Sequence, residues 1–121
     1  MVTSMHIPQF IYKVASREIY EASLAAGSFV GQPIDLKDGY IHFSTAAQLG
    51  ETIRLYFAGL GDQVLFQVPT APLGEALKWE ASRGGDLFPH LFATLPMSSV
   101  SDMARLDVPA DGIALLPDWV K

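Results

Sequence analysis

One passage of the sequence changes from a strand pattern to a helical pattern without an intervening loop. Residues 40–44 (YIHFS) alternate with a period of two, so that Tyr40, His42 and Ser44 share one face and the two apolar residues share the other. Thr45 to Gln48 then has the spacing of a capping box, and apolar residues follow at helical spacing: Leu49, Ile53, Tyr56 and Phe57. The chain must therefore fold with a strand that runs directly into a helix.

The remaining patterns place β-prone and helical segments around this passage. Ser16 is a suitable N-cap and Gly27 a suitable end for a first helix, and Gly50 in the second helix suggests close packing. Strands are predicted at 11–15, 64–68 (central) and 77–80, an extended segment at 92–95, a loop at 29–38, and a closing hairpin formed by 103–108 and 113–116. Strands outnumber helices late in the chain, which favours a single α+β domain over a doubly wound parallel sheet.

Composition excludes several classes of protein. The chain has 121 residues, of which half are hydrophobic, and we expect one domain spanning residues 1–121. It contains no cysteine, and its net charge of −5 disfavours broad nucleic-acid binding. No apolar run approaches the roughly 20 residues of a membrane span, and residues 1–10 lack the pattern of a signal peptide. We therefore expect a cytoplasmic protein that does not contact membranes.

His42 is the first candidate functional residue. It lies on the strand face that leads into the predicted helix start at Ser44 and Thr45. Free backbone N–H groups at a helix start attract anions such as phosphate, and the two hydroxyl groups could add donors. The alternative is structural: His42 is then a half-buried strand residue, and Ser44 and Thr45 only cap the helix.

The second candidate is the segment 78–92 (KWEASRGGDLFPHLF). Glu80 follows Trp79, and burial beside that ring would raise the pKa of the carboxyl group, which suits a general acid or base. Arg83 could bind phosphate, and the proline before His90 would fix where the imidazole points. The alternative is an arginine–carboxylate pair that only closes a loop over the core.

Metal and nucleophile motifs are not evident. His42, His90, Glu80 and Asp86 are possible ligands, but no HxH or HExxH spacing occurs, and we expect no metal. The sequence also lacks a GxSxG elbow, a GxGxxG motif and a Walker loop.

Three stretches together resemble a known family. They are IYKVAS, GSFVGQPIDLKDGYIHFSTAAQLGETI and LKWEASRGGDLFPHLFATLP. They are similar to the bacterial domain-of-unknown-function family nine-five-two, over about residues 10–116. The resemblance implies no established activity.

A more distant resemblance is to the ADP-ribosyltransferase-like folds, which include the RNA 2′-phosphotransferase, an NAD-using enzyme. It implies an ADP-ribosyltransferase-like mixed β-sheet core with two main helices in the N-terminal half. His42 matches the second histidine of the phosphotransferase strand, and Tyr40 stands where the first would be. Lys13, beside Tyr12, replaces the usual histidine of the first strand.

The leading hypothesis is a cleft that binds NAD, ADP-ribose or a related phosphorylated nucleotide. The resemblance makes His42, Glu80 and His90 the catalytic candidates for ADP-ribosyl transfer or N-glycosidic cleavage. It assigns ligand binding to five residues: Tyr12, Lys13, Ser44, Thr45 and Arg83. The alternatives are a non-catalytic module that binds a small molecule or a peptide, and a metal-assisted hydrolase. No protein partner is indicated.

Overall fold

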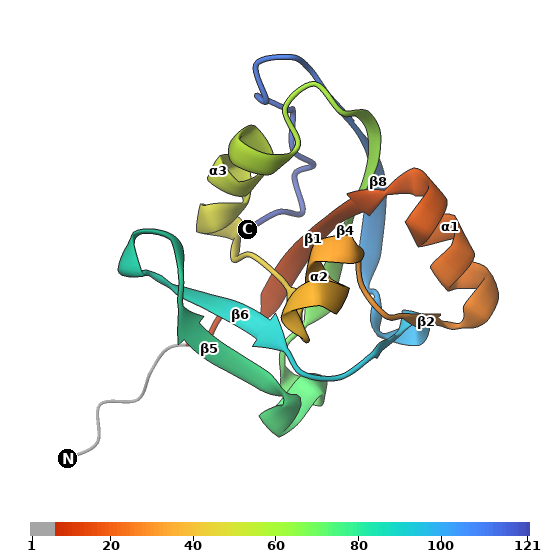
Figure 1. The fold of residues 1–121 in the computed structure, drawn as a ribbon, viewed down its shortest axis with the longest axis vertical. Coiled ribbons are helices and arrows are strands. Elements are labelled where there is room, and N and C mark those ends of the chain that lie inside the picture. Colours follow the sequence, from red (N-terminus) through yellow and green to blue (C-terminus); the bar gives the residue numbers. More distant parts are fainter. Residues whose placement is uncertain (1–6) are drawn as a thin grey trace.

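A three-stranded antiparallel sheet lies at the centre of the protein (Figure 1). It consists of β1 (Phe10–Ser16), β4 (Gly61–Pro69) and β8 (Asp102–Val108), in the order β1-β4-β8. The structure, a computed structural model, describes residues 7–121. The predicted central strand is confirmed, because β4 pairs on both sides and residues 63–68 are buried without interruption.

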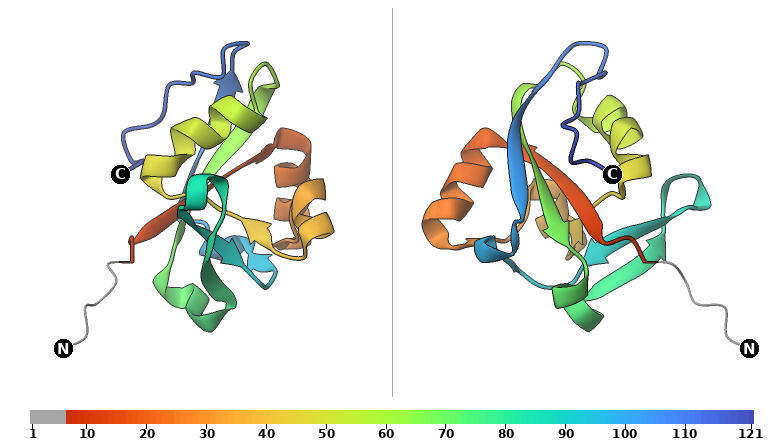
Figure 2. Two further views of the ribbon diagram at one scale, coloured as in Figure 1. Left: turned by 60° about the vertical axis from the view of Figure 1, so that its left-hand side comes forward. Right: turned by 180° about the vertical axis from the view of Figure 1, so that it is seen from behind.

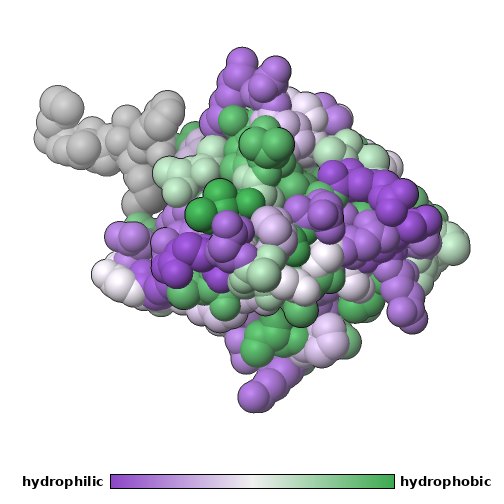
Figure 3. Space-filling view, turned by 90° about the horizontal axis from the view of Figure 1, so that it is seen from above, coloured by the Kyte–Doolittle hydropathy of each residue, from purple (hydrophilic) through white to green (hydrophobic). Residues whose placement is uncertain are grey.

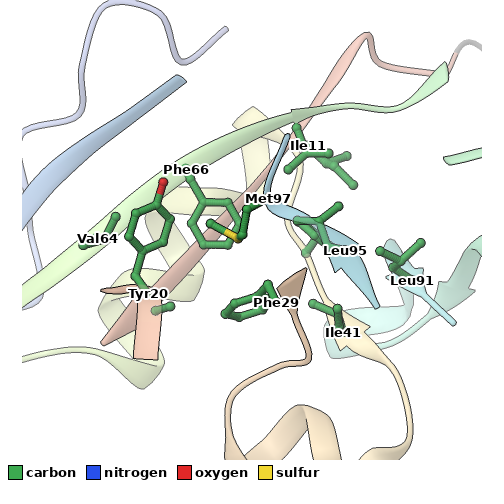
Figure 4. Packing of buried hydrophobic residues seen from close by; sticks show 12 residues of the cluster. Ile11, Tyr20, Phe29, Ile41, Val64, Phe66, Leu91, Leu95 and Met97 are labelled. Atoms are coloured by element: carbon green, nitrogen blue, oxygen red, sulfur yellow. The ribbon is translucent and has the colours of Figure 1, made fainter. Parts of the chain in front are cut away.

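The two longest helices cover opposite faces of this sheet (Figure 2). Helix α1 (Arg17–Ala26) packs through Tyr20 into one cluster, where Phe66 contacts Tyr20 and Phe29 (Figure 4). Helix α3 (Ala46–Tyr56) packs into a second cluster, which contains Tyr12, Val14, Leu49, Ile53, Leu65, Leu106 and Val108. Ile11 and Ala15 of β1 enter the first cluster and Tyr12 and Val14 the second, so the strand is apolar on both faces except at Lys13.

The predicted helix ends are confirmed. Ser16 caps α1 by accepting a hydrogen bond from the backbone N–H of Ile19 (3.2 Å), and Gly27 ends it with a left-handed φ of 85°. Thr45 and Gln48 form the predicted capping box of α3. Local capping chemistry therefore sets where both helices begin.

A second antiparallel sheet carries the two segments that the sequence singled out. It is formed by β3 (Ile41–His42), β6 (Leu87–Leu91) and β5 (Leu77–Ala81), in that order. One face packs into the first cluster through Ile41, Leu91 and Trp79. Two backbone hydrogen bonds between Tyr12 and Ser44 (2.8 and 2.9 Å) join this sheet to β1.

Short elements complete the fold. Strands β2 (Ser28–Phe29) and β7 (Leu95–Pro96) form a small ladder, and 3-10 turns span Ala71–Ala76, Arg83–Gly85 and Met97–Ser99. The predicted α+β class, with two main helices in the N-terminal half, is confirmed. The expected mixed-sheet core takes the form of three separate sheets whose described ladders are all antiparallel.

Three predictions about local structure are wrong. The expected loop at 29–38 contains a helix, α2 (Pro33–Asp38). The closing hairpin does not form: residues 113–116 are not a strand, and Ala114 and Leu116 pack against the α3 cluster instead. Gly50 does not serve close packing, because a Cβ atom there would meet nothing within 4 Å.

The surface is mixed in character. Hydrophobic and hydrophilic residues interleave on the face seen from above (Figure 3). Within residues 7–121, no helix is long and apolar enough to cross a membrane.

Candidate functional site

The two segments that sequence analysis singled out meet in the second sheet. His42 on β3 lies directly opposite His90 on β6 in the antiparallel register. Lys78 on β5 lies opposite His90 in turn, so the three side chains form one row across the sheet. Because alternate residues share a face, Tyr40 and Glu80 lie on the same face as this row. His42, Glu80 and His90, which sequence analysis selected as candidates, therefore lie together on one face of this sheet.

Tyr40 is the aromatic centre of this group. Its ring stacks on His90 at 4.3 Å between centroids, with an interplanar angle of 30°. It also lies 4.5 Å from the ring of His42 and 5.0 Å from that of Phe92. The two histidine rings contact each other edge to face at 5.4 Å. Tyr40 therefore fixes the orientation of both imidazole rings.

Asp35 is the residue that sequence analysis missed. It is buried in α2, and its Oδ1 atom accepts hydrogen bonds from the backbone N–H of His42 (3.0 Å) and from Lys13 Nζ (3.0 Å). The Nδ1 atom of His42 lies 2.6 Å from the same oxygen. The other oxygen, Oδ2, accepts from the backbone N–H of Gln32 (2.7 Å). Asp35 therefore ties β1, α2 and β3 together at the site.

The charge state of Asp35 follows from these contacts. Burial alone would raise the pKa of the carboxyl group. The hydrogen bonds from His42 and the charge of Lys13 outweigh that effect and lower the pKa of Asp35 from 3.8 to about 2. Burial lowers the pKa of Lys13, and Asp35 opposes that change. Asp35 is thus an ionised carboxylate at neutral pH.

His42 is held by a second carboxylate as well. Its Nε2 atom lies 2.9 Å from Oδ2 of Asp38, which is the last residue of α2. Carboxylates only accept, so both histidine contacts are hydrogen bonds when the ring carries two protons. Burial, and then the charges of Asp38, Glu80 and Asp35, raise the pKa of Tyr40. These three carboxylates therefore make the electrostatic environment of Tyr40 negative.

Glu80 and His90 form a second histidine–carboxylate pair. Oε1 of Glu80 lies 2.8 Å from Nδ1 of His90. The side chain of His90 is 4% exposed, whereas that of Glu80 is 43% exposed. Glu80 is not buried beside Trp79 as expected, because the two alternate along β5 and Trp79 packs against the first cluster. Its carboxylate therefore faces both the buried imidazole and solvent.

Arg83 does not join the histidine group, defined as Asp35, Tyr40, His42, Glu80 and His90. Its guanidinium lies over the ring of Phe88, 4.9 Å from the centroid, and both terminal nitrogens lie 3.4 Å from Oγ1 of Thr52 in α3. The expected pairing with Glu80 or Asp86 does not form. Arg83 instead bridges the 3-10 turn of residues 83–85 and α3, at the edge of the second sheet.

Three residues predicted to bind ligand lie elsewhere or are already engaged. Tyr12 is fully buried and its ring stacks on Trp119, so it cannot stack on a ligand. Ser44 is buried, with its hydroxyl 3.0 Å from that of Thr52. Thr45 Oγ1 accepts from the backbone N–H of Gln48. The structural alternative therefore accounts for Thr45, which caps α3, whereas the Ser44 hydroxyl bonds a side chain inside the helix instead of capping it.

The described surface has a hollow beside the histidine group and another away from it. One, of about 300 Å³, lies beside the histidine group and is lined by residues that include Asp35, Tyr40 and Phe92. The other, of about 240 Å³, lies between α3 and residues 112–116, away from the histidine group. No group of three or more His, Asp or Glu side chains within residues 7–121 is arranged to hold a metal ion.

Comparisons with known proteins place the chain in a family. A family model described as "Protein of unknown function (DUF952)" matches residues 14–103. The crystal structure of protein CC0527 from Caulobacter crescentus is similar, at 48% identity and a TM-score of 0.86, over 92% of this chain and 97% of that one. The solution NMR structure of CC0527 also matches, at 48% identity and a TM-score of 0.80, over 92% of this chain and 96% of that one. No curated protein matches the chain significantly.

Proposed function

Because the chain belongs to the DUF952 family, whose function is unknown, we propose a function from the geometry of its histidine group. The proposal is a cleft, in an ADP-ribosyltransferase-like fold, that binds NAD, ADP-ribose or a related ribonucleotide. The observation that carries it is the register of His42 opposite His90, which gathers Tyr40 and Glu80 on one face. Neither of the two sequence segments could form such a surface alone.

The ring of such a ligand has a suitable place beside Tyr40. The adjacent hollow of about 300 Å³ is lined by both Tyr40 and Phe92. Phe92 is 41% exposed, although it is a large apolar side chain. Aromatic rings stack favourably on planar groups, typically by about 1–3 kcal/mol for a nucleobase. This supports a base or a nicotinamide ring at the hollow.

The ribose has a suitable partner in Glu80. The carboxylate is half exposed, and its Oε1 is already oriented by His90. A carboxylate has acceptor sites on both oxygens and can receive further hydrogen bonds from ribose hydroxyls. This supports the assignment of Glu80 as the residue that binds the ribose.

The phosphates fit the cleft less well near His42 than at its edge. His42 lies between Asp35 and Asp38, and the charge of Lys13 is compensated by Asp35, so a phosphate there would find each nearby cation already paired with a carboxylate. Among residues 7–121, Arg83 is the ligand-binding candidate whose cation pairs with no carboxylate. We therefore assign the ring and the ribose to the Tyr40–Glu80 side and the phosphates to Arg83.

The same negative environment suits one class of reaction. Cleavage of an N-glycosidic bond builds positive charge on the sugar. Carboxylates held in place before the reaction stabilise such charge, because they need no reorganisation. For catalysis, the proposed reaction is accordingly ADP-ribosyl transfer or N-glycosidic cleavage, with Glu80 closest to the sugar.

Isothermal titration calorimetry with NAD, ADP-ribose and 2′-phosphorylated RNA tests the proposal. We expect heat with at least one of them, and a loss of affinity of about tenfold or more in Glu80→Gln, since hydrogen bonds to charged groups contribute about 1.5–3 kcal/mol. Glu75→Gln is the matched control, because Glu75 is an exposed carboxylate in the preceding 3-10 turn. No heat with any of the three ligands would remove the ligand assignment.

The same titration distinguishes the binding-module alternative. Ligand binding that survives Glu80→Gln, with no product formed on prolonged incubation, would assign the cleft to binding alone. The observation that favours this alternative is the hydrogen bond between Glu80 and His90. If Glu80 only holds His90 in place, it stabilises the cleft and does not contact the ligand.

A further inference from the structure

One polar atom of the histidine group has no partner in the site described so far. Nδ1 of His90 lies 2.8 Å from Glu80, but Nε2 forms no hydrogen bond within residues 7–121. The side chain is only 4% exposed. Yet the described residues contain no buried side-chain nitrogen or oxygen without a partner. The small exposed part of the ring must therefore include Nε2.

The neighbours of His90 fix which nitrogen carries the proton. The carboxylate of Glu80 can only accept, so Nδ1 donates to it. In the neutral ring this leaves a lone pair on Nε2. Stacking on Tyr40 and the edge contact with His42 prevent the ring from turning. His42 differs, because both of its nitrogens contact carboxylates.

We infer that Nε2 of His90 is the hydrogen-bond acceptor of the cleft and that Glu80 is its positioning residue. The ligand class is one that presents a hydroxyl or N–H donor to this atom, as a ribose does; this part of the inference rests on the proposed function. A buried acceptor of fixed orientation selects ligands that carry a donor. A ligand without one would displace water from Nε2 and leave this nitrogen without a hydrogen bond, which weakens binding.

The first test needs no ligand. In long-range ¹H–¹⁵N spectra, the neutral imidazole of His90 should carry its proton on Nδ1 and leave Nε2 unprotonated. Glu80→Gln keeps an acceptor oxygen and should preserve this tautomer, whereas Glu80→Ala should lose it. Glu75→Ala, which changes an exposed carboxylate nearby, should leave the spectrum unchanged. A neutral ring with its proton on Nε2 in the wild-type protein would overturn the inference.

The second test asks whether Nε2 is open. Diethyl pyrocarbonate attacks unprotonated imidazole nitrogens, and mass spectrometry locates the product. We expect His90 to be modified faster than His42. An unmodified His90 would overturn the inference, because a sealed nitrogen cannot receive a ligand.

The third test adds ADP-ribose to the labelled protein. We expect the Nε2 resonance of His90 to shift and diethyl pyrocarbonate to be excluded. If calorimetry shows binding and the resonance does not move, the inference fails and the proposed function stands. If no nucleotide binds, the proposed function fails, and the tautomer and modification results alone decide whether His90 is an open acceptor.

Discussion

Replacing Asp35 by asparagine should destabilise the protein more than any other conservative change in the histidine group. The substitution keeps the shape of the side chain but removes the charge that compensates Lys13, which is 6% exposed. It also turns one acceptor oxygen into an NH₂ group, which would face either the backbone N–H of Gln32 or the donors on His42 and Lys13. Breaking a buried pair from one side typically costs about 3–5 kcal/mol.

Urea denaturation measures this effect. With a slope of about 2 kcal/mol per molar, a loss of about 3 kcal/mol lowers the midpoint by about 1.5 M. The double variant Lys13→Met with Asp35→Asn should recover part of the loss, because it removes the uncompensated charge. Asp38→Asn is the exposed control and should change the stability by no more than about 1 kcal/mol.

The pH dependence of unfolding gives an independent check. The pKa of Asp35 is about 2 in the folded protein, below its value of 3.8 in the unfolded chain. Its ionisation therefore stabilises the fold fully above about pH 4, and this stabilisation disappears as the pH falls from about 4 to about 2. The difference corresponds to about 2 kcal/mol. Asp35→Asn should lack this part of the acid dependence, and an identical dependence in both proteins would refute the reasoning.

Three further substitutions test the fold. Gly50→Ala should stabilise the protein by about 1 kcal/mol, because the helical site is open; a lower melting temperature would contradict this. Gly112→Ala should destabilise it by about 2 kcal/mol or more in urea, because φ is 73° and a Cβ atom would lie 2.7 Å from Cα of Arg54. An unchanged midpoint would show that the C-terminal segment moves to make room for the methyl group. Tyr12→Phe should cost about 1 kcal/mol by removing the hydroxyl bonded to Gln67, yet leave nucleotide affinity in calorimetry unchanged; weaker binding would return Tyr12 to the site.

The parts of the fold that sequence predicted correctly depend on neighbours along the chain. The capping residues Ser16 and Thr45 act within one helical turn, and Gly27 supplies a left-handed φ at its own position. The run from Val64 to Val68, which is apolar except at Gln67, identifies a strand buried on both faces. Such signals need no knowledge of the tertiary structure, so they could be recognised directly.

Helix α2 was missed although its sequence carries a helix signal. Gly31, Pro33 and Asp35 are common in turns, and their density suggested a loop. In the structure Pro33 occupies the first turn of the helix, where its missing N–H is no loss, and Asp35 accepts from the backbone of Gln32 as in a capping box. The same residue types occur in turns and at helix starts. A helix of six residues is too short for its hydrophobic periodicity to distinguish it from a loop.

The closing hairpin failed for a different reason. Residues 113–116 are apolar enough for a strand, but β8 already pairs with β4, and the segment beyond Gly112 passes against α3 instead. The partner of an apolar segment is a tertiary choice, and local propensity does not determine it.

The site shows the same limit more sharply. Sequence analysis identified His42, Glu80 and His90, but their convergence depends on the register between β3 and β6, which joins residues 48 positions apart. Lys13 was chosen only for its place in a resemblance, and its partner Asp35 lies 22 positions away in the missed helix. No pattern along the chain links these pairs.

The position of Lys13 argues that this pair serves the site and not only stability. A buried ion pair is a poor stabiliser, because two apolar side chains of similar volume often hold a fold equally well. An apolar pair could not, however, accept hydrogen bonds from both the backbone and Nδ1 of His42. Lys13 keeps Asp35 ionised within the protein, Asp35 orients His42, and Asp38 contacts the remaining nitrogen. The double variant Lys13→Met with Asp35→Asn should therefore regain stability in urea yet bind nucleotide more weakly than the wild-type protein, because Tyr40 packs against His42. Full binding in that variant would reduce the pair to a structural role.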